Sequence, residues 1–355
     1  MLPIRIGVVG LGRMGFTHAQ NIHTQIASAQ LIALCSIDDQ AAYWAKTWNI
    51  PYHYQDYAMM LANPEIDAVV IVSPTPDHPR QIKQALLAGK HVFCEKPLGT
   101  DLAECYDLVN FALKQTNQVV QIGFMRRYDR EFAAAKQLLE TGEIGRPILI
   151  RLFSQDPEVD IANMFRFGPS SGGQFVDVSA HDIDLMIWYL QAYPQRVFSL
   201  GKAYKYPEFA TWNDGDVVAG MIEFDNQQIG ILMASRISSN GYQAQGEIIG
   251  TNGHLTISLP SNAASQINYI NANGHQQQTY RNFNERFATA YVAELQAFVN
   301  RIHQQDYDNR ALVDALVNIE TALACQQAFV TRQIVDVNLN AAKNLLAIAS
   351  KKSVP

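Results

Sequence analysis

The sequence lacks any apolar run that approaches the roughly 20 residues needed to span a bilayer. It is also short of positive charge, because 27 lysines and arginines stand against 33 acidic residues, for a formal net charge of −6. The one basic cluster, Arg126, Arg127 and Arg130, is too small for a surface that follows a phosphate backbone. We therefore expect neither a membrane protein nor a partner of nucleic acids.

Cysteine is scarce, and the four cysteines form neither a CxxC pair nor a Cys/His cluster with zinc spacing. We accordingly expect no bound metal. Cys35 and Cys94 end apolar runs, so buried free thiols are the expectation, as in a reducing cytoplasm. The chain enters a strand at Ile4 without a signal peptide, which again favours a cytoplasmic protein.

The 355 residues are too many for one ordinary core, which predicts two domains. Residues 1–124 alternate short, continuously apolar runs with amphipathic helical segments, the pattern of a doubly wound parallel sheet, that is, a Rossmann domain. The predicted strands are Ile4–Val9, Leu31–Ile37, Ala68–Val72, His91–Cys94 and Val119–Ile122. A helix is expected over His78–Ala88 with Gly89 as its left-handed cap, and Asp101 with Glu104 forms a capping box for the next.

Residues 125–355 have a different pattern and predict an α+β domain with a large, open, mostly antiparallel sheet. Its expected strands are Val197–Lys205, Asp216–Phe224, Ile229–Ile237, Tyr242–Ile249 and His254–Ser258. Its expected helices are Tyr128–Glu140, Val176–Tyr189, Glu285–His303 and Ala311–Val330.

A glycine-rich turn follows the first strand and opens a helix: Gly10, Leu11, Gly12, Arg13, Met14 and Gly15. In this context GxGxxG predicts a dinucleotide site, with the pyrophosphate at the helix N-terminus. Asp38 ends the second strand, where a carboxylate can bind the adenosine ribose and would repel a 2′-phosphate, so NAD is favoured over NADP. The alternative is that Asp38 only caps the next helix, although Asp39 could do that instead.

Two further segments end strands at the ligand-binding edge of this sheet. Ser73, Pro74 and Thr75 lead to His78 and predict a loop beside the nicotinamide ribose, or else a plain helix cap. Glu95, Lys96 and Pro97 end a buried strand, where neighbours can tune a lysine for chemistry, although most lysines are only solvated charges.

Asp177 and His181 are four residues apart in a predicted helix and follow the glycine pair Gly172 and Gly173. Alcohol oxidation needs a base for the hydroxyl proton, and neutral histidine suits that role near neutral pH. Spacing alone equally allows a core histidine paired with its helical neighbour.

These motifs, in this order, resemble the glucose–fructose oxidoreductase, inositol dehydrogenase and rhizopine-catabolism (Gfo/Idh/MocA) superfamily along nearly the whole chain. The resemblance rests on the glycine turn with His18-Ala19, on Phe93 to Leu98, and on Asp177 with His181 to Asp184. Residues Val120 to Asp129, Arg286-Phe287 and Tyr291 to Leu295 are most similar to its bacterial inositol 2-dehydrogenases.

The resemblance implies NAD-dependent oxidation of a ring hydroxyl, with Lys96, Asp177 and His181 as the catalytic trio. It implies substrate contacts from these three and from Met125, Arg126, Asp156, Tyr242 and Tyr291. Asp156 and Phe283 depart from the pattern, which has asparagine and tryptophan there, and this leaves the stereoisomer open. The family's Lys-Pro bond is often cis, so a cis bond is expected at Lys96–Pro97.

Three alternatives remain at this stage. Arg126 is either a fork for the substrate or a salt-bridge partner of Asp129. The substrate is a polyol such as inositol or, in a neighbouring subfamily, a pyranose sugar. A regulator that binds NAD without turnover would have lost Lys96 or His181, and both are present. The resemblance also implies a homotetramer, for which the free face of the second sheet is a natural interface.

Overall fold

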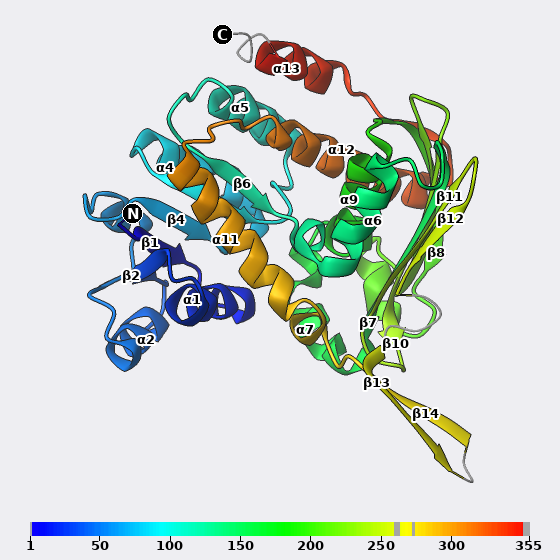
Figure 1. Ribbon diagram of the computed structural model, residues 1–355, viewed down its shortest axis with the longest axis horizontal. Helices are drawn as coiled ribbons and strands as arrows, with labels where there is room; N and C mark the ends of the chain where they lie inside the picture. The colour runs from blue at the N-terminus through cyan, green and yellow to red at the C-terminus, as the bar shows by residue number, and fades with distance from the viewer. Residues whose placement is uncertain (1, 259–262, 272–273, 351–355) are drawn as a thin grey trace. The chain divides into compact units, whose positions relative to one another are not determined.

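The computed structural model describes residues 2–258, 263–271 and 274–350, and the chain divides into two compact units (Figure 1). The first consists of Met1–Met125, Thr289–Ile319 and Asn340–Pro355, and the second of Arg126–Ala288 and Glu320–Leu339. The chain thus leaves the first unit after Met125 and returns to it twice. Within the described ranges, no helix is both long and apolar enough to cross a membrane.

The first unit is built on the predicted Rossmann sheet. Its six strands are all parallel, in the order β3-β2-β1-β4-β5-β6. They are β1 (Ile4–Val9), β2 (Ala29–Cys35), β3 (Tyr52–Tyr54), β4 (Ala68–Ile71), β5 (His91–Glu95) and β6 (Val120–Gly123). Five match predicted strands within two residues at each end, whereas β3, only three residues long, was not predicted. The strand order reverses between β1 and β4, the point at which such sheets bind ligands.

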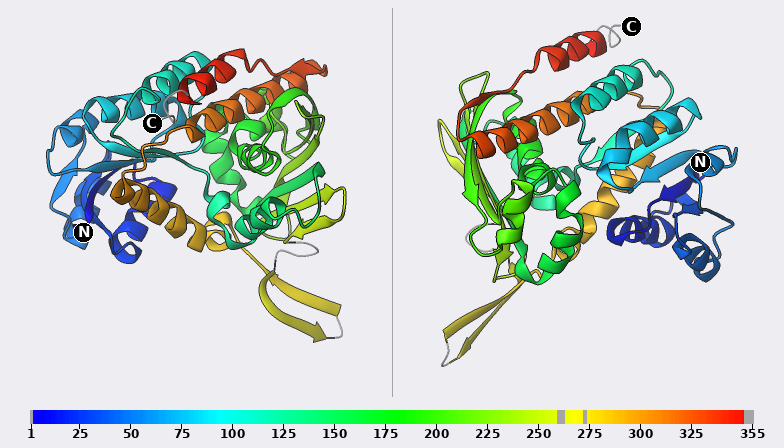
Figure 2. Two further views of the ribbon diagram at one scale, coloured as in Figure 1. Left: turned by 45° about the horizontal axis from the view of Figure 1, so that its top comes forward. Right: turned by 180° about the vertical axis from the view of Figure 1, so that it is seen from behind.

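Helices cover this sheet on its two faces (Figures 1 and 2). One core cluster joins β1, β2 and β4 to α1 (Arg13–Gln25), α2 (Gln40–Trp48) and α11 (Ala288–Gln304) through residues such as Ile22, Leu34 and Phe298. On the other face α4 (His78–Leu87) contacts α5 (Leu102–Ala112), which contacts α13 (Asn340–Ser350). The short α3 (Tyr57–Leu61) follows β3, and α12 (Ala311–Thr331) carries the chain from the first unit into the second.

Local signals behave as predicted in this unit. Gly89 follows α4 with φ +77°, and Asp101 caps α5 by accepting the Glu104 N–H at 3.0 Å. All four cysteines are free and buried. The left-handed conformation of a glycine and the hydrogen bond of a helix cap involve only residues that are neighbours in the chain. Both features can therefore be predicted from the sequence.

The second unit is built on a seven-stranded sheet in the order β12-β11-β7-β10-β9-β8-β15. Only the β7–β10 pair is parallel, so the prediction of a mostly antiparallel sheet is confirmed. The strands are β7 (Pro147–Pro157), β8 (Pro194–Lys202), β9 (Val217–Phe224), β10 (Ile229–Ser238), β11 (Gln243–Gly250), β12 (His254–Ile257) and β15 (Val335–Asp336). Strand β7 was not predicted, although it lies inside the sheet and extends over eleven residues.

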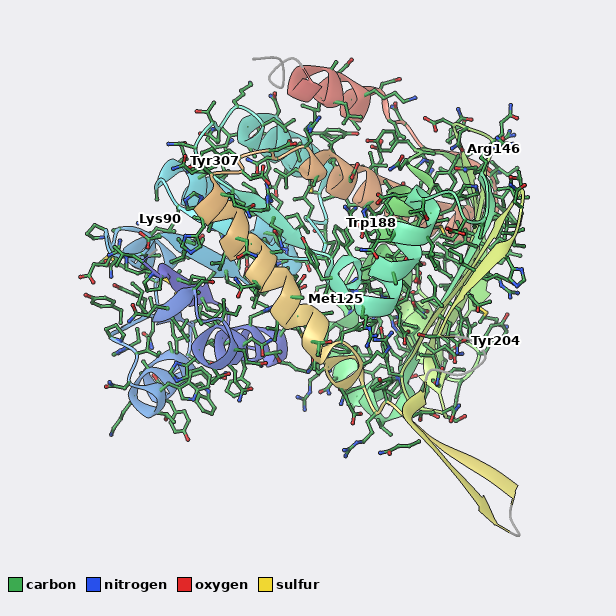
Figure 3. The ribbon with its side chains drawn as sticks, viewed as in Figure 1. Lys90, Met125, Arg146, Trp188, Tyr204 and Tyr307 are labelled. Atoms are coloured by element: carbon green, nitrogen blue, oxygen red, sulfur yellow. The ribbon has the colours of Figure 1, made fainter. Side chains whose placement is uncertain are left out.

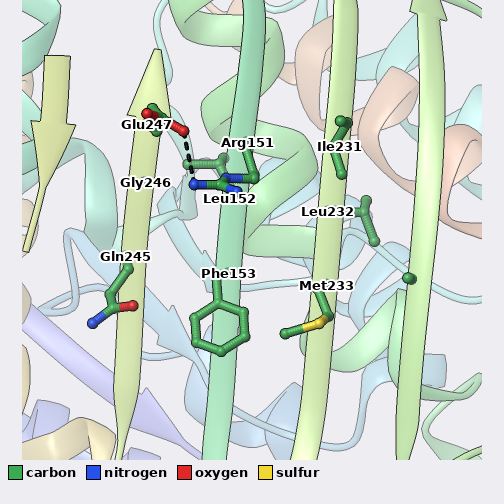
Figure 4. Close-up of a pocket in the computed structure, with 10 residues that line it drawn as sticks. Arg151, Leu152, Phe153, Ile231, Leu232, Met233, Gln245, Gly246 and Glu247 are labelled. Carbon is green, nitrogen blue, oxygen red and sulfur yellow. Dashed lines mark ion pairs between the residues drawn. The ribbon is translucent and has the colours of Figure 1, made fainter. Parts of the chain in front are cut away.

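Helix α9 (Ala180–Leu190) packs on β7 and β10 and covers one face of this sheet. The opposite face is open and bears a hollow of about 380 Å³ (Figure 4). Along β10 the alternation is regular, with Leu232 and Ala234 buried and Ile231 and Met233 half-exposed on the open side. A two-stranded hairpin, β13 (Ala263–Asn271) with β14 (Gly274–Thr279), extends from this unit (Figure 1).

The remaining helices of the second unit are short, apart from α6 (Arg130–Glu140). Asp129 caps α6, and Gly142 and Gly145 follow it at φ +78° and +69°, as the predicted helix end requires. The others are α7 (Ile161–Phe167), α8 (Gln174–Asp177) and α10 (Phe283–Arg286).

Candidate active site

The glycine turn in the first unit has the geometry of a dinucleotide site. Gly10 has φ +85°, and a Cβ there would lie 2.5 Å from the Val72 carbonyl oxygen at the end of β4. A Cβ on Gly15 would lie 1.7 Å from the Gly10 carbonyl oxygen, whereas one on Gly12 would meet no atom within 4 Å. Gly12 is the N-cap residue of α1 and, as a glycine, makes no side-chain cap there, which leaves the start of this helix suited to bind an anion. Leu11, Arg13 and Met14 complete the turn.

Asp38 follows β2 with an exposed carboxylate. Its Oδ1 accepts hydrogen bonds from the Ser36 hydroxyl at 2.7 Å and the Gln40 backbone N–H at 3.1 Å, and Oδ2 accepts from the Gln40 amide. These bonds lower the pKa of Asp38, the Ser36 bond most strongly. Asp39 precedes α2 but makes no side-chain cap, so Asp38 performs the capping that the sequence could have assigned to Asp39. A capping carboxylate retains lone pairs for a ribose, and both roles are compatible.

The loop after β4 is tied to the loop after β5 by His78. This buried imidazole lies with Nδ1 2.8 Å from the Pro97 carbonyl oxygen and Nε2 2.9 Å from that of Ser73. Burial lowers its pKa. His78 therefore positions the Ser73-Pro74-Thr75 loop through its ring, and its contact with a cofactor stays a prediction.

Lys96 follows β5 with its backbone held on both sides. Its N–H donates to Oε2 of Glu95 at 3.0 Å, and the Lys96–Pro97 bond is cis, as expected. The other oxygen of Glu95 lies 2.7 Å from Nε2 of His18, a fully buried residue of α1. The Lys96 side chain itself is half-buried.

In the second unit, Asp177 and His181 lie on two short helices rather than one. The predicted helix Val176–Tyr189 is wrong in this respect: α8 ends at Asp177 and α9 begins at Ala180. The Ser179 N–H bonds the Gln174 carbonyl five residues back, and the His181 N–H bonds the Val178 carbonyl three residues back. Such interruptions of the helical ladder are frequent at functional sites. Although Asp177 and His181 are four residues apart, they therefore do not lie on one face of a regular helix.

Asp177 is held by a buried arginine from β10. The Arg236 guanidinium lies 3.7 Å from Oδ2 of Asp177, forms an ion pair with Asp214, and stacks 4.9 Å from the Phe209 ring centroid. Asp214 in turn accepts the Gln174 N–H, the first residue of α8, at 3.0 Å. The start and the end of α8 are thus fixed by one ionic cluster.

The glycines before α8 are required by its surroundings. Gly172 and Gly173 have φ +79° and +89°, and a Cβ on Gly173 would lie 2.7 Å from Oε1 of Gln326. Any other residue would push Gln326 away or strain the turn.

Arg126 is a buried member of a different polar cluster. Its Nη1 donates to Asp182 at 2.6 Å, and its Nη2 donates to the Ser154 hydroxyl at 2.9 Å and the Tyr242 hydroxyl at 3.1 Å. Burial lowers the pKa of this guanidinium, but its interactions with Tyr242 and Asp182 raise that pKa above its usual value. The alternative pairing with Asp129 is wrong, because Asp129 pairs with Arg286 at 2.7 Å.

The other predicted substrate contacts fall in both units. Asp156, buried on β7, adds its charge to the burial that raises the pKa of Tyr242, whose O–H thus stays protonated. The Tyr242 ring lies 6.3 Å from that of Phe283. Met125 (labelled in Figure 3) and Tyr291 are buried in the first unit, where the Tyr291 ring meets His18 edge-on at 5.7 Å. The structure thus gathers Arg126, Asp156 and Tyr242, while the catalytic trio is divided between the units.

The sequence analysis assigned no role to four residues around these sites: Arg236 and Asp214, which it did not mention, and Glu294 and Asp182, which it included only within motifs of the resemblance. Glu294 lies between Tyr291 and Leu295 on the apolar face of α11, where a charged residue is unusual. Asp182 sits in a helix that is buried along nearly all its length. In both cases a carboxylate within an apolar helical pattern was the sequence signal from which Glu294 and Asp182 could have been predicted.

Comparison with known proteins gives matches along nearly the whole chain. Residues 4–124 match a family model described as an oxidoreductase family with an NAD-binding Rossmann fold, and residues 132–256 match the GFO/IDH/MocA C-terminal domain. The chain is 33% identical to scyllo-inositol 2-dehydrogenase (NAD(+)) of Bacillus subtilis, over 92% of this chain and 94% of that protein.

Two further relatives agree. Myo-inositol 2-dehydrogenase of Thermotoga maritima is 30% identical, over 84% of this chain and 88% of its own. The crystal structure of scyllo-inositol dehydrogenase from Lactobacillus casei with bound NAD(H) and scyllo-inositol is similar with a TM-score of 0.91 and 38% identity, covering 94% of this chain and 99% of that one.

Proposed function

The chain belongs to the GFO/IDH/MocA family of NAD-binding oxidoreductases, and from this premise we propose that it is an NAD-dependent inositol 2-dehydrogenase that oxidises a ring CH–OH to a ketone. The observation that carries the proposal is that full-length similarity to inositol dehydrogenases coincides with the residues such a reaction needs. These are an NAD turn, a lysine at the end of β5, and an aspartate and a histidine in the second unit.

The test is a screen in which NAD reduction is followed with scyllo-inositol, myo-inositol, other inositol isomers and common pyranoses. We expect scyllo-inositol to be oxidised with the highest kcat/KM. In support, the Bacillus subtilis relative and the Lactobacillus casei structure are both scyllo-inositol dehydrogenases. If only a pyranose is oxidised, the substrate is a sugar and not an inositol. If none of these compounds is oxidised, the protein is a binding protein without turnover.

The residues of the first unit fit NAD. The open space over Gly12 and the uncapped start of α1 suit a pyrophosphate, and Asp38 suits the adenosine ribose. The loop of Ser73, Pro74 and Thr75 with His78, and the segment of Glu95 and Lys96, end the strands on the other side of the topological switch point. When bound, NAD accepts the hydride from the carbinol carbon.

The protein's own groups handle the proton. We assign His181 as the base that removes the hydroxyl proton of the substrate. Lys96 donates a hydrogen bond to the reacting oxygen, and Asp177, held by Arg236, stabilises the positive charge that His181 gains. Arg126, Asp156 and Tyr242, with Met125 and Tyr291, are assigned to the polyol. Both terminal nitrogens of Arg126 already donate to protein groups, and one of them holds the Tyr242 hydroxyl in place.

Cofactor choice gives a direct test of Asp38. We expect kcat/KM with NAD to exceed that with NADP by roughly 100-fold or more, because a carboxylate facing a 2′-phosphate costs several kcal/mol. Asp38→Ser should narrow this ratio, whereas the matched variant Asp39→Ser should leave it unchanged. Equal kcat/KM values for the two cofactors in the unmodified protein would contradict the role of Asp38.

We further propose a homotetramer that forms through the open face of the seven-stranded sheet. In support, this face is largely apolar: Leu200 is 49% exposed and Met221 55%, and Phe153, Ile231 and Met233 line the hollow seen in Figure 4. An ion pair of Arg151 with Glu247 at 2.8 Å lies at its edge. Contiguous apolar patches of this kind mark association surfaces.

Met233→Glu tests the tetramer, because it places a charge in the centre of that face. We expect the variant to elute at a lower mass in size-exclusion chromatography with light scattering, with its melting temperature showing that it is folded. Met59→Glu is the matched control, since Met59 is 63% exposed on α3 of the other unit and should not change the mass. A variant Met233→Glu that keeps the original mass would place the interface elsewhere.

Finally, we propose a cytoplasmic location. The support is that all four cysteines are free, as expected of a reducing compartment. A fusion to a fluorescent protein, followed by cell fractionation, tests this.

A further inference from the structure

Three ionisable side chains meet inside the first unit, and two of them, His18 and Glu294, have no role in the proposed function. They are His18 on α1, Glu95 at the end of β5 and Glu294 on α11, with exposed fractions of 0%, 8% and 0%. One nitrogen or oxygen atom from each lies within 4.8 Å of the other two. Such a concentration of polar groups in a core is costly unless each charge is neutralised or hydrogen-bonded.

Glu95 links His18 to the backbone of Lys96. Glu95 uses one oxygen for His18, at 2.7 Å, and the other for the Lys96 backbone N–H, at 3.0 Å. Gly123 on β6 leaves room for this carboxylate, since a Cβ there would lie 3.4 Å from Oε2 of Glu95 and 3.0 Å from the Phe93 ring. The position of the Glu95 carboxylate therefore decides where the Lys96 backbone lies.

Glu294 is the third member and differs from the other two. Within the described part of the chain, neither oxygen of its carboxyl group has a hydrogen-bond partner. Burial raises the pKa of Glu294 well above its ordinary value, and the charge of Glu95 raises it further. A second carboxylate beside Glu95 would be both desolvated and repelled, so the neutral acid is the favoured form.

The groups around Glu294 come from four elements. Helix α1 supplies His18, and β5 supplies Glu95, the residue directly before Lys96. Strand β6 supplies the Gln121 amide, which donates to the Glu294 backbone carbonyl at 2.9 Å, and α11 itself supplies Tyr291, whose ring packs on His18. Glu95 is the acidic neighbour whose charge acts on Glu294.

We propose that Glu294 is held as the neutral acid and donates its proton in a hydrogen bond toward Glu95, so that His18, Glu95 and Glu294 form a buried cluster that positions the backbone of Lys96. A separation of up to 4.8 Å is closed by a small side-chain rotation or by one bridging water. Glu294 is thus a positioning residue that acts through Glu95. Its effect on turnover rests on the proposed function of Lys96, but its protonation and its effect on the backbone do not.

Two substitutions and one control separate the possibilities. Glu294→Gln keeps the shape and one donor toward Glu95 but cannot ionise, and Glu294→Leu keeps most of the volume but has no donor. Gln296→Ala is the control on the same helix, because Gln296 bonds Ser28 and Asn300 instead. All three are compared with the unmodified full-length chain.

The first measurement is the melting temperature against pH. A carboxyl group whose pKa is raised on folding makes the folded state bind more protons than the unfolded state, so stability falls as pH rises above the unfolded value of about 4.3. We therefore expect the unmodified chain to lose melting temperature relative to Glu294→Gln between about pH 5 and pH 8. A difference that stays constant, or grows in favour of the unmodified chain, would show that Glu294 is ionised in the fold.

The second measurement is hydrogen exchange of the peptide that contains Lys96, followed by mass spectrometry. We expect Glu294→Leu to speed exchange of this peptide and Glu294→Gln and Gln296→Ala to leave it unchanged. In the kinetic assay, Glu294→Leu should lower kcat by roughly 10- to 100-fold with little change in the KM for inositol, because small displacements of a reacting group have effects of that order. Glu294→Gln should stay near the original kcat.

Melting temperature and hydrogen exchange are measured without substrate, so they test the role of Glu294 even if the proposed function is wrong. Unchanged exchange in Glu294→Leu would overturn the positioning role. A divalent metal that copurifies with the unmodified chain and is lost in Glu294→Gln, as measured by elemental analysis, would show that a cation rather than a proton neutralises the cluster.

Discussion

Replacing Lys96 by methionine is expected to remove nearly all turnover while NAD still binds. Methionine keeps the length and the apolar stem of lysine but supplies no donor for the reacting oxygen. General acid–base groups contribute roughly 100- to 10,000-fold in rate, and a loss of kcat in this range is the expected result. Steady-state kinetics with inositol give kcat, and calorimetric titration gives the dissociation constant for NAD.

The control is Lys90→Met, at the other end of the same strand. Lys90 (labelled in Figure 3) donates to the carbonyl oxygens of Asn63 and Ile66 at 2.8 and 2.7 Å, so its role is to hold a loop. We expect this variant to melt at a lower temperature but to keep its kcat. If Lys96→Met behaves in the same way as Lys90→Met, then Lys96 is an ordinary charge at the end of a strand.

Replacing His181 by alanine is expected to lower kcat/KM by roughly 100-fold or more and to remove the rise of kcat/KM with pH. In the unmodified enzyme this rise should follow the deprotonation of one group. Adding Asp177→Ala should cost little more, because residues that act as a unit are not additive. The pH profiles of the two single variants and of the double variant test this.

Two results would contradict that expectation. Losses that multiply in the double variant would show that Asp177 and His181 act independently. A His181→Ala variant with a lowered melting temperature but normal turnover would show a core histidine. Since Asp177 is held by the buried Arg236, Asp177→Asn is the milder control: it keeps the shape at the end of α8 while removing the charge.

The interrupted helix shows where a sequence pattern stops being informative. A spacing of four predicts one helical face, and the residues around Asp177 and His181 have helical propensity. The break at Val178–Ser179 arises because α8 is tied at its start to Asp214 and at its end to Arg236, which come from a loop and a strand far along the chain. Those ties exist only in the folded unit.

The missed strand β7 has a similar explanation. It begins and ends at proline and its second half contains charged and polar residues, which disfavour a strand when the segment is considered in isolation. It is a strand because β10 and β11 flank it on both sides and pair with its backbone. Pairing of this kind is a property of the sheet and not of the segment.

The features that the sequence alone determined are those whose physics is local. Three such features depend only on neighbours in the chain: a glycine turn between a buried strand and a helix, a carboxylate after the second strand, and an apolar period of two or 3.6 residues. They predicted the Rossmann sheet, the cofactor NAD and the mostly antiparallel second sheet. The tertiary structure alone decided which polar groups share a core: Arg126 with Asp182 and not Asp129, Arg236 with Asp177, and Glu294 with Glu95 and His18. A buried charge without a partner costs several kcal/mol, so each buried charge pairs with a group that lies next to it in space. Residues more than 50 positions apart in the sequence come that close only when the chain has folded.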